Sequence, residues 1–232
     1  MTLSWPSAPP VLGGPLVTLR PWRSSDRDAV FTACQDPDIQ RWTTVPSPYL
    51  HEHAAGFVDG YAKEQWATRR GTPFCIASTG DDEVLGSCDV FSIDTKNLVA
   101  EMGYWVAPWA RGQGVASQAV GILSGWAMGD IGLGRLELLI RPDNAASRAV
   151  AERAGGVFEG ILRGKVLDKG ERIDMALYAL VRCPASITPR PCRSRPLQRP
   201  VDWRTSRLGR TPATCASRGR AGRWGAGCRR AR

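Results

Sequence analysis

The chain has 232 residues, 43% of them hydrophobic, and a formal net charge of +9. This composition is ordinary for a globular protein with one substantial domain, and no apolar run approaches the ~18 residues that cross a bilayer. The N-terminus lacks the basic start and apolar segment of a signal peptide, so we expect a soluble cytoplasmic protein with no membrane partner.

The charge is distributed unevenly along the chain. Thirteen arginines and one aspartate give residues 184–232 a net charge of +12, which leaves −3 of the total +9 for residues 1–183. The high pI therefore does not indicate that the body of the protein binds nucleic acid. A mildly acidic body suits a cationic amine substrate better than a phosphate backbone.

The first part of the chain predicts one strand and two helices. Residues 1–13 are rich in proline, serine and glycine and predict a flexible arm. Alternating apolar residues predict a strand over residues 16–22. Ser24-Ser25-Asp26 offers an N-cap for a helix that ends near Cys34, and apolar spacing predicts a second helix over residues 50–69.

The next part predicts an antiparallel meander followed by alternating helices and strands. Turn residues separate three apolar runs, and a glycine-rich loop follows the third of them. The expected elements are strands over residues 74–78, 84–93 and 98–106, a helix over 114–128, a strand over 135–140, a helix over 144–153, and strands over 157–166 and 172–180. This order predicts an α+β fold around a mixed sheet.

Residues 184–232 differ from the rest in composition. Arg-Pro and Arg-Gly dipeptides recur there, and Ile, Val and Phe are almost absent. Such a segment buries too little apolar area to offset the entropy of ordering, so we predict a disordered tail. It is interpreted either as a nucleic-acid-binding arm or as an extension without function, and we favour the second interpretation.

The seven cysteines and two histidines do not form the pattern of a disulfide framework or a metal site. The number of cysteines is odd, no Cys-x-x-Cys pair occurs, and His51 and His53 lie far from any cluster of thiols in the sequence. We therefore expect no metal and interpret the thiols as small buried side chains.

The most informative segment is Arg111-Gly112-Gln113-Gly114-Val115-Ala116. It follows a predicted strand and opens a predicted helix, so unpaired backbone N–H groups and the helix dipole point at one place, which favours an anion. The two glycines allow a phosphate to approach the backbone closely. A P-loop would need Gly-Lys-Ser/Thr, and a dinucleotide-binding loop would need a third glycine where Ser117 stands, so both are disfavoured.

Arg111-x-x-Gly114-x-Ala116 resembles the pyrophosphate signature of the GNAT superfamily of N-acetyltransferases, Arg/Gln-x-x-Gly-x-Gly/Ala. The resemblance extends over about residues 16–182. Gly103–Pro108 resembles the strand that precedes this signature. Two later segments, Arg141–Val150 and Ala154–Gly160 with Leu162-Arg163, resemble the ribosomal-protein (Rim-type) branch. The resemblance implies a GNAT fold over residues 14–183, with a mixed, mostly antiparallel sheet flanked by helices.

The resemblance also implies roles for the matching residues. The backbone of residues 111–116 would hold the pyrophosphate of acetyl-CoA. Tyr104, Trp105 and Val106 would pair edge-on with the pantetheine arm, and one of their N–H groups would polarise the thioester carbonyl. Asn144 would cap a helix and touch the pantetheine, and Ser147 would place a hydroxyl near the leaving thiolate. As alternatives, Asn144 is a helix cap only and Ser147 a surface serine.

Two positions depart from the family pattern. Gly156 stands where relatives usually have Phe, and Ala151 stands where many GNAT enzymes carry a tyrosine general acid. Protonation of the thiolate would then use Ser147, another group or water. Glu101, on the central strand, is our candidate for a general base acting through water, and its alternative is an ordinary strand carboxylate.

The sequence therefore predicts direct acetyl transfer from acetyl-CoA to a primary amine, without an acyl-enzyme intermediate. An α-amine with a pKa near 8 is available at neutral pH, whereas a lysine amine near 10.4 needs active deprotonation, so a protein N-terminus or a small amine is favoured. Two other classes stay open: a GNAT-fold module that binds acetyl-CoA without turnover, and a nucleic-acid-associated protein that acts nonspecifically through its basic tail.

Overall fold

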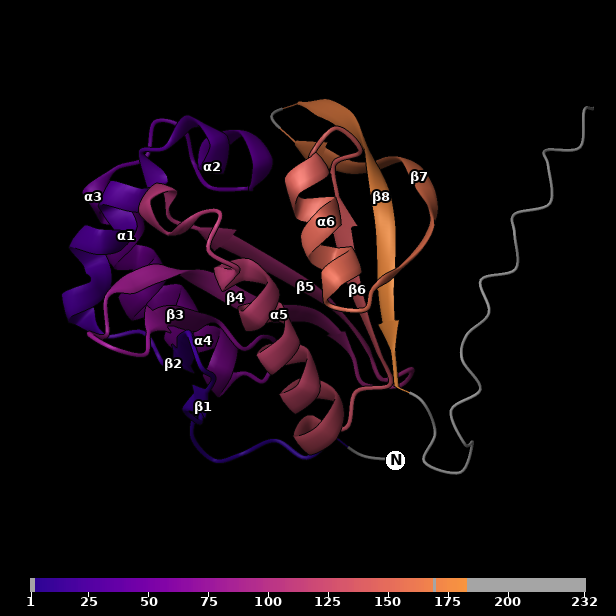
Figure 1. Ribbon diagram of the computed structural model, residues 1–232, viewed down its shortest axis with the longest axis horizontal. Helices are drawn as coiled ribbons and strands as arrows, with labels where there is room; N and C mark the ends of the chain where they lie inside the picture. The colour runs from indigo at the N-terminus through magenta and orange to yellow at the C-terminus, as the bar shows by residue number, and fades with distance from the viewer. Residues whose placement is uncertain (1–2, 169, 183–232) are drawn as a thin grey trace, which may run out of the picture. The chain divides into compact units, whose positions relative to one another are not determined.

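Eight strands form one mixed sheet within residues 3–168 and 170–182, which are the residues that the computed structural model describes (Figure 1). The strand order is β1-β2-β3-β4-β5-β6-β8-β7, and β5 and β6 are parallel whereas the other neighbours are antiparallel. The strands are β1 (Leu12–Gly13), β2 (Val17–Arg20), β3 (Phe74–Ser78), β4 (Val84–Asp94), β5 (Val99–Val106), β6 (Arg135–Ile140), β7 (Val157–Asp168) and β8 (Glu171–Val181). The α+β prediction is confirmed, and the tail at 184–232 lies outside the described residues.

Helices lie against both faces of the sheet. Three short pieces, α3, η2 and α4, follow one another without a break and form the helical stretch expected over residues 50–69. The helices are η1 (Ser24–Asp26), α1 (Arg27–Cys34), α2 (Pro37–Trp42), α3 (His51–Ala55), η2 (Gly56–Tyr61), α4 (Ala62–Ala67), η3 (Pro108–Ala110), α5 (Val115–Trp126), η4 (Ala127–Ile131) and α6 (Ala145–Arg153).

Alternation along β3 separates two buried clusters. Phe74 and Ile76 belong to the cluster beneath α5 and α6, whereas Cys75 and Ala77 belong to the cluster beneath α1–α4. Side chains of successive strand residues point to opposite faces, so one strand serves both clusters. The central strands are therefore buried on both faces, which explains their nearly continuous apolar sequence.

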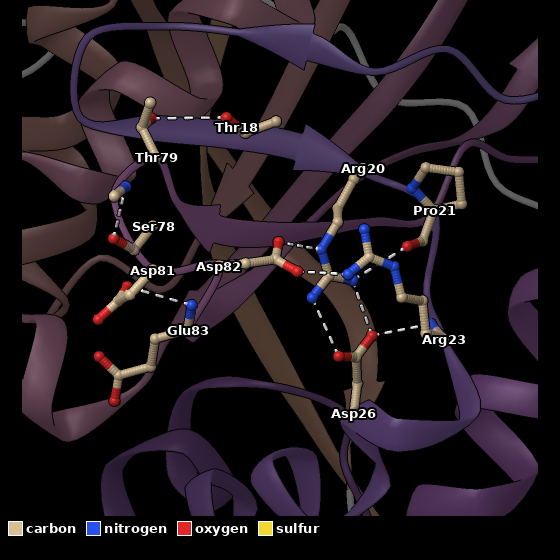
Figure 2. A network of polar contacts seen from close by, with 11 residues as sticks. Thr18, Arg20, Pro21, Arg23, Asp26, Ser78, Thr79, Asp81, Asp82 and Glu83 are labelled. Atoms are coloured by element: carbon tan, nitrogen blue, oxygen red, sulfur yellow. Dashed lines mark hydrogen bonds and ion pairs between the residues drawn. The ribbon is translucent and has the colours of Figure 1, made fainter.

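A buried arginine joins β2 to two neighbouring turns (Figure 2). Arg20, with a side chain 3% exposed, donates to both carboxylate oxygens of Asp26 at 2.8 and 3.0 Å and to Asp82 at 2.6 Å. The Asp26 carboxylate also accepts from the N–H of Arg23 at 2.7 Å. Because each charge has an opposite partner, the network can remain buried, and it fixes η1 and the β3–β4 turn to the end of β2.

The segment before β2 differs from our expectation. Residues 3–13 do not form a detached arm: the Trp5 ring lies 5.3 Å from that of Trp66, Ser4 N–H donates to Ile131 O at 2.9 Å, and Leu12 pairs with Leu19. Aromatic burial outweighs the proline-rich composition here. Residues 1 and 2 lie outside the described part of the chain.

Helix α2 has no counterpart among the expected elements. It is only six residues long, too short for an apolar period to be visible. Its start nevertheless carries a local signal, because the Asp36 side chain accepts from Ile39 N–H at 2.9 Å and Pro37 occupies the first helical turn.

Candidate active site

The sheet opens into a gap between β5 and β6. The parallel pairing covers only residues 99–101 of β5 against 135–137 of β6, and the strands then diverge (Figure 1). β5 remains paired with β4 to its end. Ala107 N–H donates to Leu85 O at 2.8 Å. Because residues that bond to the partner strand alternate with residues that do not, the N–H and C=O of Tyr104 and the N–H of Val106 point away from β4. This free strand edge can pair with an extended ligand.

The N-terminus of α5 lies at the carboxyl end of the same strand. Gly112 and Gly114 adopt positive φ angles of 76° and 83°, a conformation that favours glycine. Within the described part of the chain, the backbone N–H groups of residues 112–117 have no hydrogen-bond acceptor. Together with the helix dipole they form a site for an anion, as the sequence predicts.

The side chain of Arg111 is engaged with the protein. Its guanidinium donates to Asp36 at 2.6 Å, to Asp38 at 3.5 Å and to Val106 O at 3.4 Å. Burial alone would raise the pKa of Asp36, but Arg111 and the Ile39 N–H hold that pKa below its usual value. Arg111 therefore fixes the glycine loop to the N-terminus of α2 in this structure.

Tyr104 and Ser147 meet at the start of α6. The Tyr104 hydroxyl lies 2.7 Å from Ser147 Oγ and 3.3 Å from Ser147 O. Asn144 caps the helix, because its side-chain oxygen accepts from Ser147 N–H at 3.0 Å. Burial raises the pKa of Tyr104 to about 12. Tyr104 and Ser147 are 43 positions apart in the sequence, which predicts separate roles for them, but they are in contact in the structure.

One of the two departures from the family pattern, Gly156, has a physical explanation. A Cβ atom at Gly156 would lie 2.9 Å from the carbonyl oxygen of Ala151, which is fully buried. A larger residue at 156 therefore requires the backbone to shift. An aromatic contact nearby comes from Phe158, whose ring centroid lies 5.4 Å from that of Tyr178.

Glu101 lies at the base of the gap. It is half-buried, is the last β5 residue paired with β6, and stands in register with Glu137. Glu137 is bound by Arg135 at 2.7 Å, whereas Glu101 has no ion pair among the described residues. Because strand side chains alternate, Glu101 and Tyr104 project from opposite faces of β5. The site thus presents a carboxylate on one face of β5 and a pair of hydroxyls on the other.

Asp89 is a half-buried carboxyl group that the sequence did not single out. It lies on β4 opposite Gly103, and its oxygen accepts from Thr72 N–H at 2.8 Å. Burial raises its pKa to about 7. An acid near the end of the largely apolar run Val84–Val90 was the available signal.

A cavity of about 510 Å³ lies between α2, the carboxyl end of β6 and the β7–β8 hairpin. Its charged lining residues are Arg41, Arg141, Asp168 and Glu171. Arg141 and Asp168 approach to 3.7 Å, and Arg41 contacts Asp143 at 3.4 Å. The cavity is polar and open to a charged acceptor.

The thiols within the described residues, Cys34, Cys75 and Cys88, are buried and unpaired. Burial raises the pKa of Cys34 to about 11 and that of Cys75 to about 12, so neither is a ready nucleophile. The part of the chain that the structure describes contains no cluster of three metal-ligating side chains. No helix among residues 3–168 and 170–182 is long and apolar enough to span a membrane.

Comparison with known proteins decides the family. A model described as an acetyltransferase (GNAT) domain matches residues 17–157, more than half of the chain. The chain belongs to this acetyltransferase family. The fold and the enzyme class that the sequence predicts are thereby confirmed, whereas the roles of individual site residues stay predictions.

Relatives of this acetyltransferase include proteins named for ribosomal substrates. An uncharacterized N-acetyltransferase, p20 of Bacillus licheniformis, is 27% identical over 72% of this chain and 93% of its own length. The ribosomal-protein-serine acetyltransferase of Escherichia coli (strain K12) is 34% identical over 44% of this chain and 56% of its own length. The structure of Mycobacterium smegmatis RimJ in complex with CoA-disulfide is 26% identical, with a TM-score of 0.68 over 78% of this chain and 90% of that one.

Proposed function

We propose that this acetyltransferase moves an acetyl group from acetyl-CoA to the α-amine of a protein or to a small primary amine. The observation that carries the proposal is the continuous path from the free edge of β5 to the unpaired N–H groups at the start of α5. The edge suits the amide-containing pantetheine arm, and the helix start suits the pyrophosphate. The CoA-bound RimJ structure supports the same donor.

The chemistry needs a neutral amine, a polarised carbonyl and a stabilised thiolate. Glu101, through water, accepts a proton from the amine on one face of β5. The free backbone N–H of Tyr104 or of Val106 polarises the thioester carbonyl. The amine then forms the C–N bond, the C–S bond breaks with its electron pair on sulfur, and the thiolate departs on the side of Ser147.

The acceptor reaches this point through the cavity beside α2. Its arginines and carboxylates can contact both the ammonium group and the polar backbone of a peptide. An α-amine needs less help with deprotonation than a lysine side chain does. The relative named as a ribosomal-protein-serine acetyltransferase favours a protein acceptor over a free small amine.

The Gly114→Glu variant tests the donor site. The new carboxylate would occupy the place of the phosphates and should weaken acetyl-CoA binding at least about 100-fold, measured by calorimetry. Gly132→Glu is the matched control, because Gly132 also has a positive φ, of 94°, and open space around it. Equal affinity of the two folded variants for acetyl-CoA would refute the donor site. Separately, a thiol-release screen of amines and N-terminal peptides with the wild-type enzyme identifies the acceptor.

A further inference from the structure

The hydroxyl of Tyr104 reaches out of the β5 edge to the first turn of α6. Tyr104 belongs to the part of β5 that has left β6, and its hydroxyl lies 2.7 Å from Ser147 Oγ. The phenol is therefore placed on the α6 side of the strand, where Ala151 leaves no hydroxyl of its own. Ser147 remains partly exposed, so a ligand in the gap can reach it.

Two properties of the hydroxyls bear on which of them donates the hydrogen bond. A phenol is more acidic than an aliphatic alcohol and is the better donor. The 2.7 Å contact with Ser147 Oγ is also shorter than the 3.3 Å contact with Ser147 O, and hydroxyl pairs prefer the shorter distance. Either hydroxyl can donate across the 2.7 Å contact. The acidity and the distance favour Tyr104 as the donor, which leaves the hydrogen of Ser147 to point elsewhere.

We propose that Tyr104 is a positioning residue that directs the Ser147 hydroxyl toward the sulfur of the bound thioester, where it stabilises the departing thiolate. The proposal rests on the proposed function, because it needs CoA in the gap. When the C–S bond breaks, the electron pair goes to sulfur, and Ser147 donates a hydrogen bond to it. The Tyr104–Ser147 pair gives up no proton in this step.

Proton transfer from the pair to the sulfur is disfavoured on acidity. The pKa of Tyr104 is raised to about 12 by burial, whereas an ordinary thiol titrates near 8.5. A thiolate would therefore not take the phenol proton. Ala151 stands where many relatives carry a tyrosine acid. Here an oriented hydroxyl stabilises the leaving group, so no tyrosine acid on α6 is needed.

Other titratable groups around the pair are occupied or buried. Cys88 faces Tyr104 from β4 and is fully buried, and burial raises its pKa. On α6, Arg148 and Glu152 are both bound to the Tyr178 hydroxyl, at 2.9 and 3.0 Å. The CoA thiol is then the group near the pair that changes charge between pH 7 and pH 9.

Tyr178 provides a matched control. It contacts α6 through its hydroxyl as Tyr104 does, but it lies on β8 and is fully buried. Tyr178→Phe removes a hydroxyl bound to α6 without touching Ser147. Tyr104→Phe and Ser147→Ala are the test variants.

The first measurement is the binding of CoA and of desulfo-CoA, which lacks the thiol, between pH 6.5 and about 9.5. If Ser147 stabilises a thiolate, the pKa of the bound thiol falls, and wild-type affinity for CoA should rise about 10-fold relative to desulfo-CoA as pH increases. Tyr104→Phe and Ser147→Ala should lose most of this rise, and Tyr178→Phe should keep it. Equal curves for Tyr104→Phe and wild type would overturn the proposal, whereas failure of the wild type to bind either compound would instead refute the proposed function.

The second measurement is a double-mutant cycle on turnover. Each single variant should lower kcat about 10-fold with the KM for acetyl-CoA nearly unchanged, and the double variant should lose no more than Ser147→Ala alone. Additive losses would mean that Tyr104 acts independently of Ser147 and would overturn the positioning role.

Discussion

The two arms of the sheet on either side of the gap are built differently. The first arm, β1–β5, is buried between helices on both faces and contains the Arg20 network. In the second arm, β6, β8 and β7, helix α6 packs on one face, and β7 has no buried residue among those described. Leu167 and Val157 are 63% and 60% exposed. The first arm is a rigid scaffold, and the site depends on how a less buried arm is held against it.

Few pairings hold the arms together at the base of the gap. The ladder between β5 and β6 spans three residues. Beyond it the arms share one buried apolar cluster, which joins Met102 to Leu138 and Tyr178, and side-chain bonds such as Tyr104 to Ser147 and Arg41 to Asp143. The polar contacts across the gap thus add to a shared apolar core in holding the two arms against each other. Substitutions in the two arms should therefore differ in kind.

The largest expected effect is on turnover, and it tests whether the general base is Glu101 of the first arm. Glu101→Gln should lower kcat by roughly 10²–10⁴-fold because the amine loses its proton acceptor, with acetyl-CoA affinity nearly unchanged. Glu137→Gln, in register on the second arm, is the control and should cost little because Arg135 already neutralises that carboxylate. A pH–rate profile whose acidic limb survives in Glu101→Gln would exclude Glu101.

The next effect is on stability, and it compares an ion pair from each arm. Asp26→Asn leaves the buried charge of Arg20 without its main partner and should lower the free energy of unfolding by about 3–5 kcal/mol. Glu159→Gln breaks the exposed pair with Arg135 and should cost less than about 1 kcal/mol. Urea denaturation of both variants measures the contrast, and similar losses would contradict the difference between the arms.

A smaller effect concerns the pH dependence that burial imposes on the first arm. The pKa of Asp89 is raised to about 7, above the unfolded value near 3.9, so the folded state favours the protonated carboxyl. This stabilisation is complete below pH 4 and is lost as pH rises through 7, by about 2–4 kcal/mol. Asp89→Asn should therefore gain stability relative to wild type between pH 5 and pH 8. If the free energies of unfolding of wild type and Asp89→Asn differ by the same amount at every pH, ionisation of Asp89 does not affect stability.

The sequence predicts the regular elements better than the contacts between them. Strands over 74–78 and 135–140 match β3 and β6 because their apolar runs are bounded by turn residues. Helix α2 was missed, and with it the Asp36 carboxylate that binds Arg111. The Tyr104–Ser147 bond and the burial of Asp89 depend on strand register and on the packing of α6 and α4, which no local pattern encodes.

The parallel step from β5 to β6 has a consequence for how the binding site arises. A hairpin would have led directly from β5 into a paired antiparallel neighbour, and the end of β5 would have had no free edge. A parallel neighbour obliges the chain to travel back along the sheet, and here it does so through α5. That return starts a helix at the same end of β5 where the edge is open. One choice of chain path thus creates both the edge for an extended ligand and the positive helix end for its phosphates, so the location of the site is a property of the topology, and the loop sequence adjusts only its strength.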